Sequence, residues 1–456
     1  MIKCNPRYTA LEVLVKWHRS PHTLDSALQY FDAAIQTLSK KDRKLFNMIV
    51  FGVLRNRARI DFYIQAFSQI PFNKIKQVEL YLLRIALFQI LFLDRVPDFA
   101  AVDSMVSIAR KTLHKPAAGF INAVLRTAVK KHSTLPFPDR KSDPEKFVSI
   151  YYSMPLWLAR RWIRSYGYAA ASRLCEKINQ PPHITIRVNT LKAQKKRLMD
   201  TLRQVAKNVS LTPVARDGVS FSHPDSAIEA FETFKKGWFH VQDEAAQIVS
   251  EYLLPKPFDT VLDACAGFGG KTLHMAQLME NKGQIFAVDT QSEKLESLIH
   301  AAKRIGTDII QTRCLDILTT ASKDFPFYFD KVLLDAPCTG LGVLRRNPDA
   351  KWEKSKNDIL RLAARQKKML NTCANLVKKG GILAYAVCSC EYEENESVIH
   401  QFLNKRKDFT IDKEIKSGKH LSWPESLITE TGFIKTYPDC DNMDGFFAAK
   451  LRRKSC

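Results

Sequence analysis

The sequence predicts a multidomain protein with an all-α N-terminal domain, a small α+β middle module and a C-terminal α/β domain. Three observations support this fold class. Apolar residues recur at helical spacing from residue 8 to about residue 129, a proline-containing segment of mixed charge follows, and short β-rich runs alternate with amphipathic stretches from residue 260 onward. A length of 456 residues also exceeds the usual size of a single domain.

The helical pattern of the first domain is clearest in the stretch VELYLLRIALFQILFLDRVP, where leucine and isoleucine recur at helical spacing and Pro97 ends the run. We assign this domain to residues 1–132. The segment HSTLPFPDRKSDPEK has three prolines and little apolar content, which predicts a linker over residues 133–149. The middle module, residues 150–235, contains the stretches MPLWLARRWIRSYG and ITIRVNTLK, and the α/β domain occupies residues 236–456.

The chain is strongly basic, with a formal net charge of +23 and a pI near 9.5. Residues 1–140 hold 22 Lys and Arg against 10 Asp and Glu, so the N-terminal third carries about half of the excess. Such an excess favours a polyanionic partner over a merely solvated surface, because Lys and Arg displace counterions from phosphates. No basic stretch has a strong apolar face, and no apolar run suits a signal peptide or a membrane span, so we expect a cytoplasmic protein without a membrane partner.

Ten cysteines are scattered through the chain, which raises the question of what they do. A disulfide framework is not expected, because the chain is long and no signal peptide precedes it. A metal site is not expected either, because there is no C-x-x-C and Cys388-x-Cys390 has no second pair or nearby histidine doublet. The remaining interpretations of these thiols are buried apolar residues and a nucleophile.

Five strands are predicted in the C-terminal domain from short, nearly continuous apolar runs. They cover residues 260–264, 284–288, 308–313, 331–335 and 382–387. Continuous apolar strands joined by amphipathic helices indicate a parallel sheet covered on both faces. In such sheets, ligands bind at the carboxyl ends of the strands.

Polar residues follow each of these carboxyl ends. The first strand runs into DACAGFGGKT, the second ends in Asp289, Asp316 follows the third, the fourth ends in DAPC and the fifth ends in Cys388. The glycines let the backbone approach a ligand at the start of the next helix, and an acid about 20 residues on can accept hydrogen bonds from ribose hydroxyls. GGKT does not form a phosphate-binding P-loop, because Cys265 stands where that motif needs a glycine. Spacing alone does not say which strand-end cysteine is a nucleophile.

The motifs VLDACAGFGGKT, LLDAPCTGLGVLRRNPDAKW, YAVCSCEYEENE and MDGFFAAKL resemble those of the S-adenosylmethionine-dependent RNA cytosine-5 methyltransferases of the Sun/NOP2 family. RVNTLK and VQDEAAQ match the segments before the catalytic core, so the resemblance covers residues 150–452. FGVLRNRARIDFYI, LLRIALFQILFLDRVP and GFINAVLRTAVKKH resemble the helical RNA-binding domain of the antitermination factor NusB.

This resemblance implies a Rossmann-like class I methyltransferase domain with a mostly parallel seven-stranded sheet, and S-adenosyl-L-methionine as the cofactor. The implied partner is 16S ribosomal RNA, free or in a partly assembled small subunit, and the plain expectation for the protein is a monomer. The implied chemistry is methylation of C5 of a cytosine. Because this carbon is a poor nucleophile, a thiolate first adds to C6.

Residue roles follow from the same resemblance. Cys388 is expected to be the nucleophile, Cys338 to assist breakdown of the adduct, and Asp335 to hold the amino edge of cytosine beside the cofactor. Asp289 is expected to bind the ribose and Asp316 to lie against the adenine. The loop expected to hold the methionine moiety comprises Cys265, Ala266, Gly267, Phe268, Gly269, Gly270 and Lys271. Those expected to bind RNA are Lys271, Arg345, Arg346 and Lys351. Cys390 matches no family cysteine, and we expect it to be buried.

The chain departs from the family pattern at Gly267-Phe268, where the family has Ala-Pro, and at Val387, where it has Thr. Two alternative functions were weighed. A binding factor for RNA assembly or transcription would not need thiols at strand ends, and a DNA cytosine methyltransferase would use Cys338 as the nucleophile. The NusB-like domain and the CSC motif disfavour the second alternative.

Overall fold

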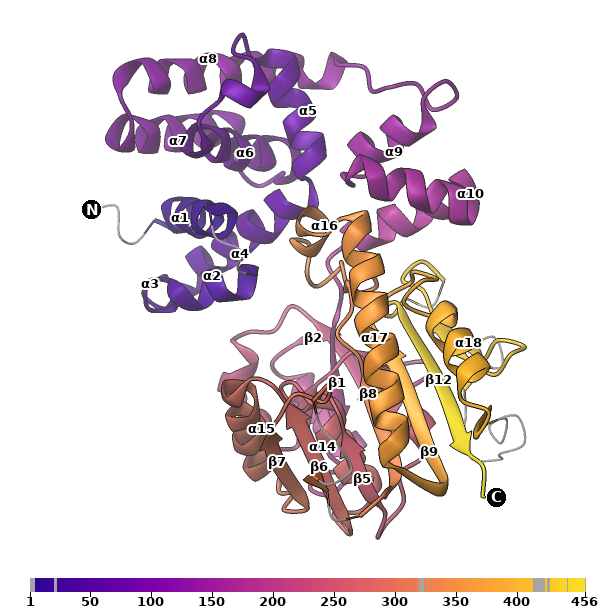
Figure 1. Ribbon diagram of the computed structural model, residues 1–456. Coiled ribbons are helices and arrows are strands. Elements are labelled where there is room, and N and C mark those ends of the chain that lie inside the picture. Colours follow the sequence, from indigo (N-terminus) through magenta and orange to yellow (C-terminus); the bar gives the residue numbers. More distant parts are fainter. Residues whose placement is uncertain are drawn as a thin grey trace. The chain divides into compact units, whose positions relative to one another are not determined.

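The computed structural model describes residues 5–19, 23–319, 324–325, 327–412, 423–424, 427–440 and 442–455 (Figure 1). The chain forms two compact units. Unit 1 comprises residues 1–180 and 344–354, and unit 2 comprises residues 181–343 and 355–456. No helix in the described part of the chain is long and apolar enough to cross a membrane.

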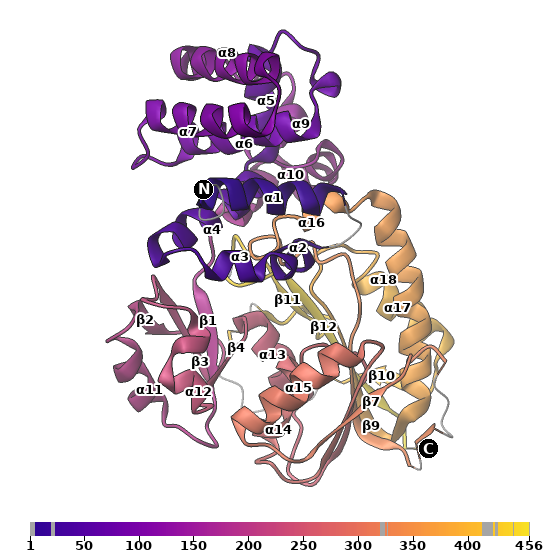
Figure 2. The same ribbon diagram turned by 90° about the vertical axis from the view of Figure 1, so that its left-hand side faces the viewer.

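Unit 1 is helical (Figures 1 and 2). Its α-helices are α1 (Pro6–Arg19), α2 (Leu24–Tyr30), α3 (Asp32–Gln36), α4 (Lys40–Arg55), α5 (Arg57–Phe67), α6 (Gln77–Phe92), α7 (Asp98–Thr112), α8 (Lys115–Lys131), α9 (Pro144–Tyr151), α10 (Leu156–Asn179) and α16 (Ala350–Glu353). The short 3₁₀-helices are η1 (Phe72–Lys74) and η2 (His132–Thr134).

Helix α6 is the centre of this unit, and it confirms the helix predicted from VELYLLRIALFQILFLDRVP. It contacts α1, α4, α5, α7 and α8, and its residues from Tyr81 to Gln89 are all buried. Arg84 lies on this apolar helix with 1% of its side chain exposed, and its guanidinium donates to both carboxylate oxygens of Asp61 at 2.7 and 2.8 Å. A helix that is buried all round requires such pairing for any charge that it carries.

Residues 344–354 join unit 1, although they lie between two elements of the C-terminal sheet in the sequence. Lys351 is buried, and its ammonium group donates to the carbonyl oxygens of Arg55 at 2.9 Å and Ser153 at 2.7 Å and to Oδ1 of Asn179 at 3.0 Å. Three acceptors match the three N–H groups of an ammonium ion. Burial lowers the pKa of Lys351 to about 7. Lys351 therefore ties the ends of α4 and α10 to this segment.

The boundaries within unit 1 differ from those predicted. The predicted linker contains the start of α9, whose N-cap Asp143 accepts from the backbone of Lys146 at 3.1 Å. Helix α10 lies in the predicted middle module but packs into the first compact unit. Helix α10 is kinked at Gly167, whose φ of +78° is a conformation that glycine adopts readily. A Cβ atom at this position would have no other atom within 4 Å.

Unit 2 begins with a small antiparallel sheet of order β2-β3-β1-β4. Its strands are β1 (Ile184–Val188), β2 (Lys207–Leu211), β3 (Gly218–Ser222) and β4 (Phe239–Val241), accompanied by α11 (Lys195–Leu202), η3 (Ile228–Ala230) and α12 (Glu232–Lys235). Ile186, Val188, Leu198, Phe221 and Phe239 share one apolar core. This confirms the predicted α+β module from residue 184 onward.

The second sheet of unit 2 has the order β10-β12-β9-β8-β5-β6-β7, and β11 pairs with β12 beside this path. Its strands are β5 (Thr260–Asp263), β6 (Gln284–Asp289), β7 (Ile310–Cys314), β8 (Phe329–Asp335), β9 (Val377–Val387), β10 (Phe409–Ile411), β11 (Ile434–Thr436) and β12 (Phe446–Arg453). The five strands from β5 to β9 pair in parallel, and β12 is antiparallel to β9. All five predicted strands and the mostly parallel sheet are confirmed, but the sheet has eight strands where seven were predicted, because the short strand β11 adds to β12.

Helices cover both faces of this sheet (Figures 1 and 2). They are α13 (Glu244–Leu253), α14 (Gly270–Leu278), α15 (Ser292–Ile305), α17 (Lys356–Leu376) and α18 (Glu396–Lys405). Successive residues of a strand point to opposite faces of the sheet, so each strand contributes to two apolar cores. Leu262 and Val332 face the core with α17 and α18, whereas Val261 and Leu333 face the core with α13 and α14.

Replacing Lys351 by Met should destabilise unit 1 by about 2–4 kcal/mol, because three buried carbonyl oxygens lose their donor. Amide hydrogen exchange in α4 and α10, read by mass spectrometry, should rise accordingly. Lys356→Met, at an exposed lysine, is the matched control and should leave exchange unchanged. Unaltered protection of α4 and α10 in Lys351→Met would contradict the role given to this lysine.

Candidate active site

The turn after β5 is shaped for a ligand. Gly267 and Gly269 have φ values of +54° and +85°, and a Cβ atom at Gly269 would lie 2.5 Å from Cγ of Leu298. Only glycine fits a backbone of that conformation so close to a neighbouring helix. Gly269 is also the N-cap of α14, so the first amides of that helix point toward the turn. The turn thus offers backbone donors where a bound group could lie.

Asp263, the last residue of β5, is hydrogen-bonded to the helix that follows this turn. It is 1% exposed, and its Oδ2 accepts a hydrogen bond from Oγ1 of Thr272 at 2.7 Å. Burial raises the pKa of Asp263 to about 7, and the hydrogen bond from Thr272 opposes this rise. The carboxyl group therefore lines the floor of the site and links the end of β5 to α14.

Two cavities flank the turn, and Cys265 and the residues beside it separate them. The first, of about 240 Å³, is lined by Gln242, Ala246, Asp263, Cys265, Ala266, Gly267, Phe268, Gly270, Lys271 and Asp335. The second, of about 210 Å³, is lined by Ala264, Cys265, Asp289, Thr290, Gln291, Lys294, Leu315, Asp316, Ile317, Pro337, Arg365 and Met369. The structure therefore places the predicted loop and Asp335 at the first cavity and Asp289 and Asp316 at the second, with Cys265 lining both.

The second cavity has the donors and acceptors that a nucleoside needs. The carboxylate of Asp289 accepts from the backbone of Gly267 at 3.0 Å and of Gln291 at 3.0 Å, one bond to each oxygen. Each oxygen keeps a lone pair, so the group can accept from two ribose hydroxyls. Leu315, Ile317 and Met369 supply apolar surface for a base, and Asp316 lies among them. These residues fit the adenosine part of S-adenosylmethionine.

Lys271 and Asp335 form an ion pair on the first cavity. Nζ of Lys271 lies 2.5 Å from Oδ2 of Asp335, and these side chains are 12% and 28% exposed. Burial alone would lower the pKa of Lys271, but the charge and hydrogen bond of Asp335 outweigh it and raise this pKa. Lys271 is therefore held as a cation by its contact with Asp335, on the wall of the first cavity.

Cys338 and Cys388 lie together at the carboxyl ends of β8 and β9. Their Sγ atoms are 3.4 Å apart. Two backbone hydrogen bonds fix the segments that carry them, from Ala336 to Ala386 at 2.8 Å and from Gly342 to Cys388 at 3.1 Å. The hydrogen bond to Cys388, burial, and the charges of Cys388 and Glu394 raise the pKa of the Cys338 thiol well above its usual value. Cys338 is therefore held as a thiol next to Cys388.

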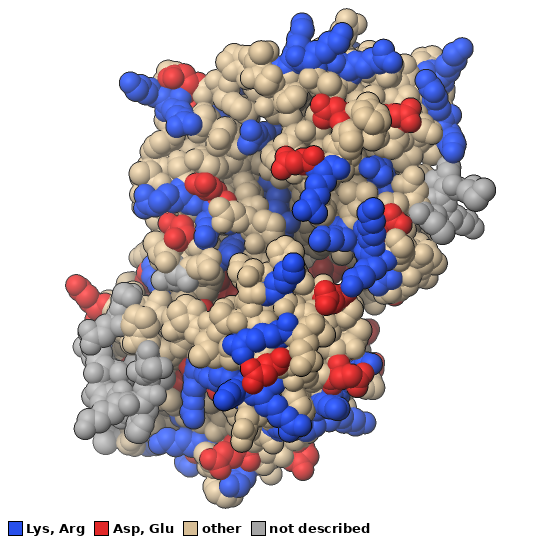
Figure 3. All heavy atoms as spheres, turned by 180° about the vertical axis from the view of Figure 1, so that it is seen from behind, with Lys and Arg blue, Asp and Glu red and all other residues tan. Residues whose placement is uncertain are grey.

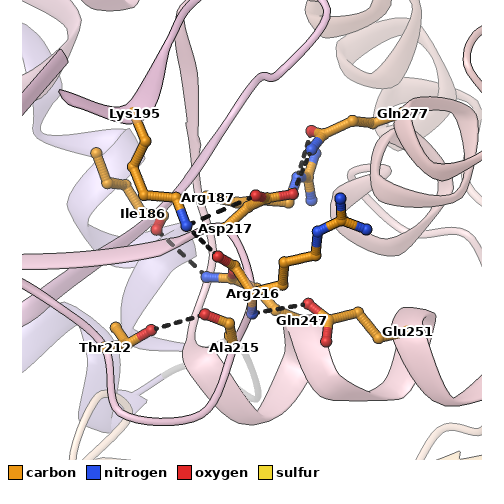
Figure 4. A network of polar contacts seen from close by, with 10 residues as sticks. All are labelled: Ile186, Arg187, Lys195, Thr212, Ala215, Arg216, Asp217, Gln247, Glu251 and Gln277. Atoms are coloured by element: carbon orange, nitrogen blue, oxygen red, sulfur yellow. Dashed lines mark hydrogen bonds and ion pairs between the residues drawn. The ribbon is translucent and has the colours of Figure 1, made fainter. Parts of the chain in front are cut away.

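A buried hydrogen-bond network around Arg187, next to the turn after β5, was not predicted from the sequence (Figure 4). Arg187 of β1 donates to the carbonyl oxygen of Gly270 at 3.1 Å, to Oε1 of Gln277 at 3.1 Å and to Oε1 of Gln242. Gln277 in turn donates to Asp217 at 3.0 Å. Burial lowers the pKa of Arg187 to about 9. The stretch RVNTLK was noted, but a single sequence does not show that its arginine points inward.

The structure corrects the role expected for Lys351 and Arg345. Both are buried in unit 1, with 1% and 4% exposed, so neither presents its charge to a phosphate. Arg346 is half-buried in the same segment. Lys271 lies at the cavity, as expected of a residue near the substrate. In the part of the chain that the structure describes, no cluster of His, Cys, Asp or Glu could hold a metal ion.

Phe268 and Val387, where the chain departs from the family pattern, and Cys390 lie in different surroundings. Phe268 is 65% exposed, and Nζ of Lys294 lies 5.8 Å from the centre of its ring. Val387 is buried in the apolar core beneath α17 and α18, where a hydroxyl would have little to bond with. Cys390 is buried, as expected, and a Cβ atom at Gly445 would lie 2.5 Å from its Sγ.

Three family models match the chain. They are the 16S rRNA methyltransferase RsmB/F at residues 250–452, the NusB family at residues 4–130, and the ferredoxin-like domain of RsmF/B-like methyltransferases at residues 154–227. The ferredoxin-like model thus spans the end of unit 1 and the start of unit 2.

Curated relatives and solved structures agree with these models. A probable ribosomal RNA small subunit methyltransferase B of Bacillus subtilis is 35% identical over 100% of both chains. The ribosomal RNA small subunit methyltransferase B of Yersinia pseudotuberculosis is 31% identical over 92% of both chains. The crystal structure of PH0851 has a TM-score of 0.82 at 27% identity, covering 98% of this chain and 99% of that one. A methyltransferase homologue from Pyrococcus horikoshii has a TM-score of 0.58 at 28% identity, covering 68% and 99%.

The buried Asp263 predicts a pH-dependent stability of unit 2. Its folded pKa of about 7 exceeds its ordinary value of 3.8, so its contribution is fully present below about pH 4 and is lost as the pH rises through 7. Asp263→Asn removes this titration. The unfolding free energy of the wild type, relative to the variant, should therefore fall by at most about 4 kcal/mol across this window. Urea unfolding at several pH values measures it, and parallel curves for the two proteins would contradict the assignment.

Proposed function

Because the chain belongs to the RsmB/F family of 16S rRNA methyltransferases, it methylates ribosomal RNA of the small subunit with S-adenosylmethionine, and we propose that the methyl group goes to C5 of a cytosine through a covalent adduct with Cys388. The observation that carries the proposal is the pair of thiols, 3.4 Å apart, at the carboxyl ends of β8 and β9. A pure binding protein would need no such pair.

S-adenosylmethionine, when bound, supplies an electrophilic methyl group on a sulfonium centre. The turn from Cys265 to Lys271 holds its methionine part in the first cavity, Asp289 holds the ribose, and Asp316 lies against the adenine. These assignments rest on the cavity linings and on the two bonds that leave the carboxylate of Asp289 able to accept more.

Cys388 starts the reaction on the cytosine. Its thiolate adds to C6, and the electron pair displaced from the C5–C6 double bond makes C5 nucleophilic toward the methyl group. Asp335 accepts from the amino group of the base, and Lys271 orients Asp335 through their 2.5 Å contact. After methyl transfer, loss of the C5 proton restores the double bond and expels the Cys388 thiolate.

Cys338 assists this last step. While Cys388 is free, its charge and hydrogen bond keep the pKa of Cys338 high. Once Cys388 is bonded to C6, both effects disappear, and Cys338 ionises more easily. A group that becomes basic only after the adduct has formed is suited to accept the C5 proton. This order of ionisation distinguishes the roles of two otherwise similar thiols.

The substrate is 16S ribosomal RNA, free or in a partly assembled small subunit, methylated in the cytoplasm by a monomer. Lys and Arg side chains are spread over the face in Figure 3, and Asp and Glu are fewer there. This surface charge supports binding to a polyanion. A cytosine that is unstacked or flipped out of a structured loop can reach a thiol at a strand end.

Cys388→Ala and Cys338→Ala separate the two roles. With 16S rRNA and methyl-labelled S-adenosylmethionine, Cys388→Ala should lose both 5-methylcytidine and covalent protein–RNA adduct, with the rate falling by at least about 10³-fold. Cys338→Ala should instead accumulate the adduct, because the C5 proton stays in place.

Cys390→Ala is the matched control, since this cysteine lies in the same motif but is buried and lines neither cavity, and its activity should stay near that of the wild type. Loss of adduct in Cys338→Ala alone would exchange the two roles. Failure of the wild type to methylate any form of small-subunit rRNA would favour a binding function.

A further inference from the structure

The acidic run after the cysteines, Glu391 to Glu396, contains the buried side chains of Glu391 and Glu394. Glu394 has none of its side chain exposed, although it follows an exposed Tyr392. A buried carboxylate is costly unless several donors surround it. The positions of the donors around Glu394 indicate the role of its carboxylate.

The carboxylate of Glu394 bonds to both segments that carry the active-site thiols. On the Cys338 side, Thr339 donates through its backbone N–H to Oε1 at 2.9 Å and through its hydroxyl to Oε2 at 2.5 Å. On the Cys388 side, the hydroxyl of Ser389 donates to Oε2 at 2.6 Å. Each partner is the residue directly after one of the cysteines.

A second layer of bonds fixes this carboxylate in turn. Gln366 of α17 donates to Oε1 of Glu394 at 3.0 Å and to the carbonyl oxygen of Pro337, the residue before Cys338, at 3.0 Å. The hydroxyl of Tyr385 donates to the carbonyl oxygen of Glu394 at 2.6 Å. Four donors thus meet the two carboxylate oxygens. Burial raises the pKa of Glu394, and these hydrogen bonds oppose the rise.

We propose that Glu394 is a positioning residue that holds Cys338 and Cys388 at the separation and orientation their reaction needs. Glu394 lines neither of the two cavities beside the turn. This inference rests on the proposed function for the meaning of the two thiols, but the geometry of the pair can be measured without catalysis.

Glu394→Gln tests the proposal with almost no change in volume. One oxygen becomes an NH₂ group, which cannot accept from Thr339 or Ser389, so one segment shifts. Displacement of reacting groups by about 1 Å costs on the order of 10²-fold in rate. We expect methyl transfer to fall by about this factor, with binding of S-adenosylmethionine and the melting temperature near those of the wild type.

Glu396→Gln is the matched control. Glu396 belongs to the same acidic run and pairs with Lys435, away from both cysteine segments. Its variant should keep the wild-type rate. If Glu394→Gln methylates as fast as Glu396→Gln, the proposal is wrong.

Oxidation by diamide reports the thiol geometry directly. The two thiols give up two protons and two electrons to the N=N bond of diamide, and a Cys338–Cys388 disulfide forms, provided that the sulfur atoms can approach to about 2.05 Å. Peptide mapping should show this disulfide forming more slowly in Glu394→Gln than in the wild type. Equal rates would mean that Glu394 does not set the geometry, whatever the assay of methylation shows.

Two milder variants distinguish positioning from general stability. Ser389→Ala removes the donor beside Cys388 and should reduce adduct formation, whereas Thr339→Val removes the hydroxyl beside Cys338 and should slow adduct breakdown, so that adduct accumulates. Identical defects in both variants would overturn the proposal. If Cys388→Ala still forms adduct, the proposed function fails instead, and the diamide result stands by itself.

Discussion

The parallel pairing of β8 with β5 on one side and β9 on the other is the constraint on which the site depends. Asp263 pairs with Leu333, and Asp335 pairs with Ala386, so the carboxyl ends of three strands lie in step. The same edge of the sheet therefore carries the turn after β5, Asp335 at the end of β8 and the two cysteines. Because side chains alternate along a strand, a shift of one residue would turn them to the opposite face.

Buried polar side chains hold this arrangement at several points, each with its own set of hydrogen-bond partners. Arg187 bonds to the carbonyl of Gly270, and Asp263 bonds to Thr272, so both act on the start of α14. Glu394 bonds to the residues after both cysteines. Without partners, each of these polar groups would destabilise the fold; surrounded by hydrogen bonds, each restricts the local backbone.

Sequence reasoning predicted the sheet well because its signals are local. Apolar runs end in polar residues at Asp289, Asp335 and Cys388, and parallel topology requires these ends to meet. The role of Lys351 could not be predicted in this way. It lies in RRNPDAKW, a charged segment that suggests solvent, and its three acceptors come from residues far away in the sequence. For the same reason, the sequence does not predict that Arg187 is buried or that residues 344–354 belong to unit 1.

The central claim is that Cys388 attacks the base and Cys338 completes the reaction. Incubation with S-adenosylmethionine and 16S rRNA that contains 5-fluorocytidine tests it most directly, because fluorine at C5 cannot leave as a cation and the adduct stays in place. Mass spectrometry of the digested complex should find the nucleotide on the peptide that contains Cys388. A nucleotide attached to Cys338, or the absence of any protein–RNA adduct with a methylation-competent enzyme, would contradict the account.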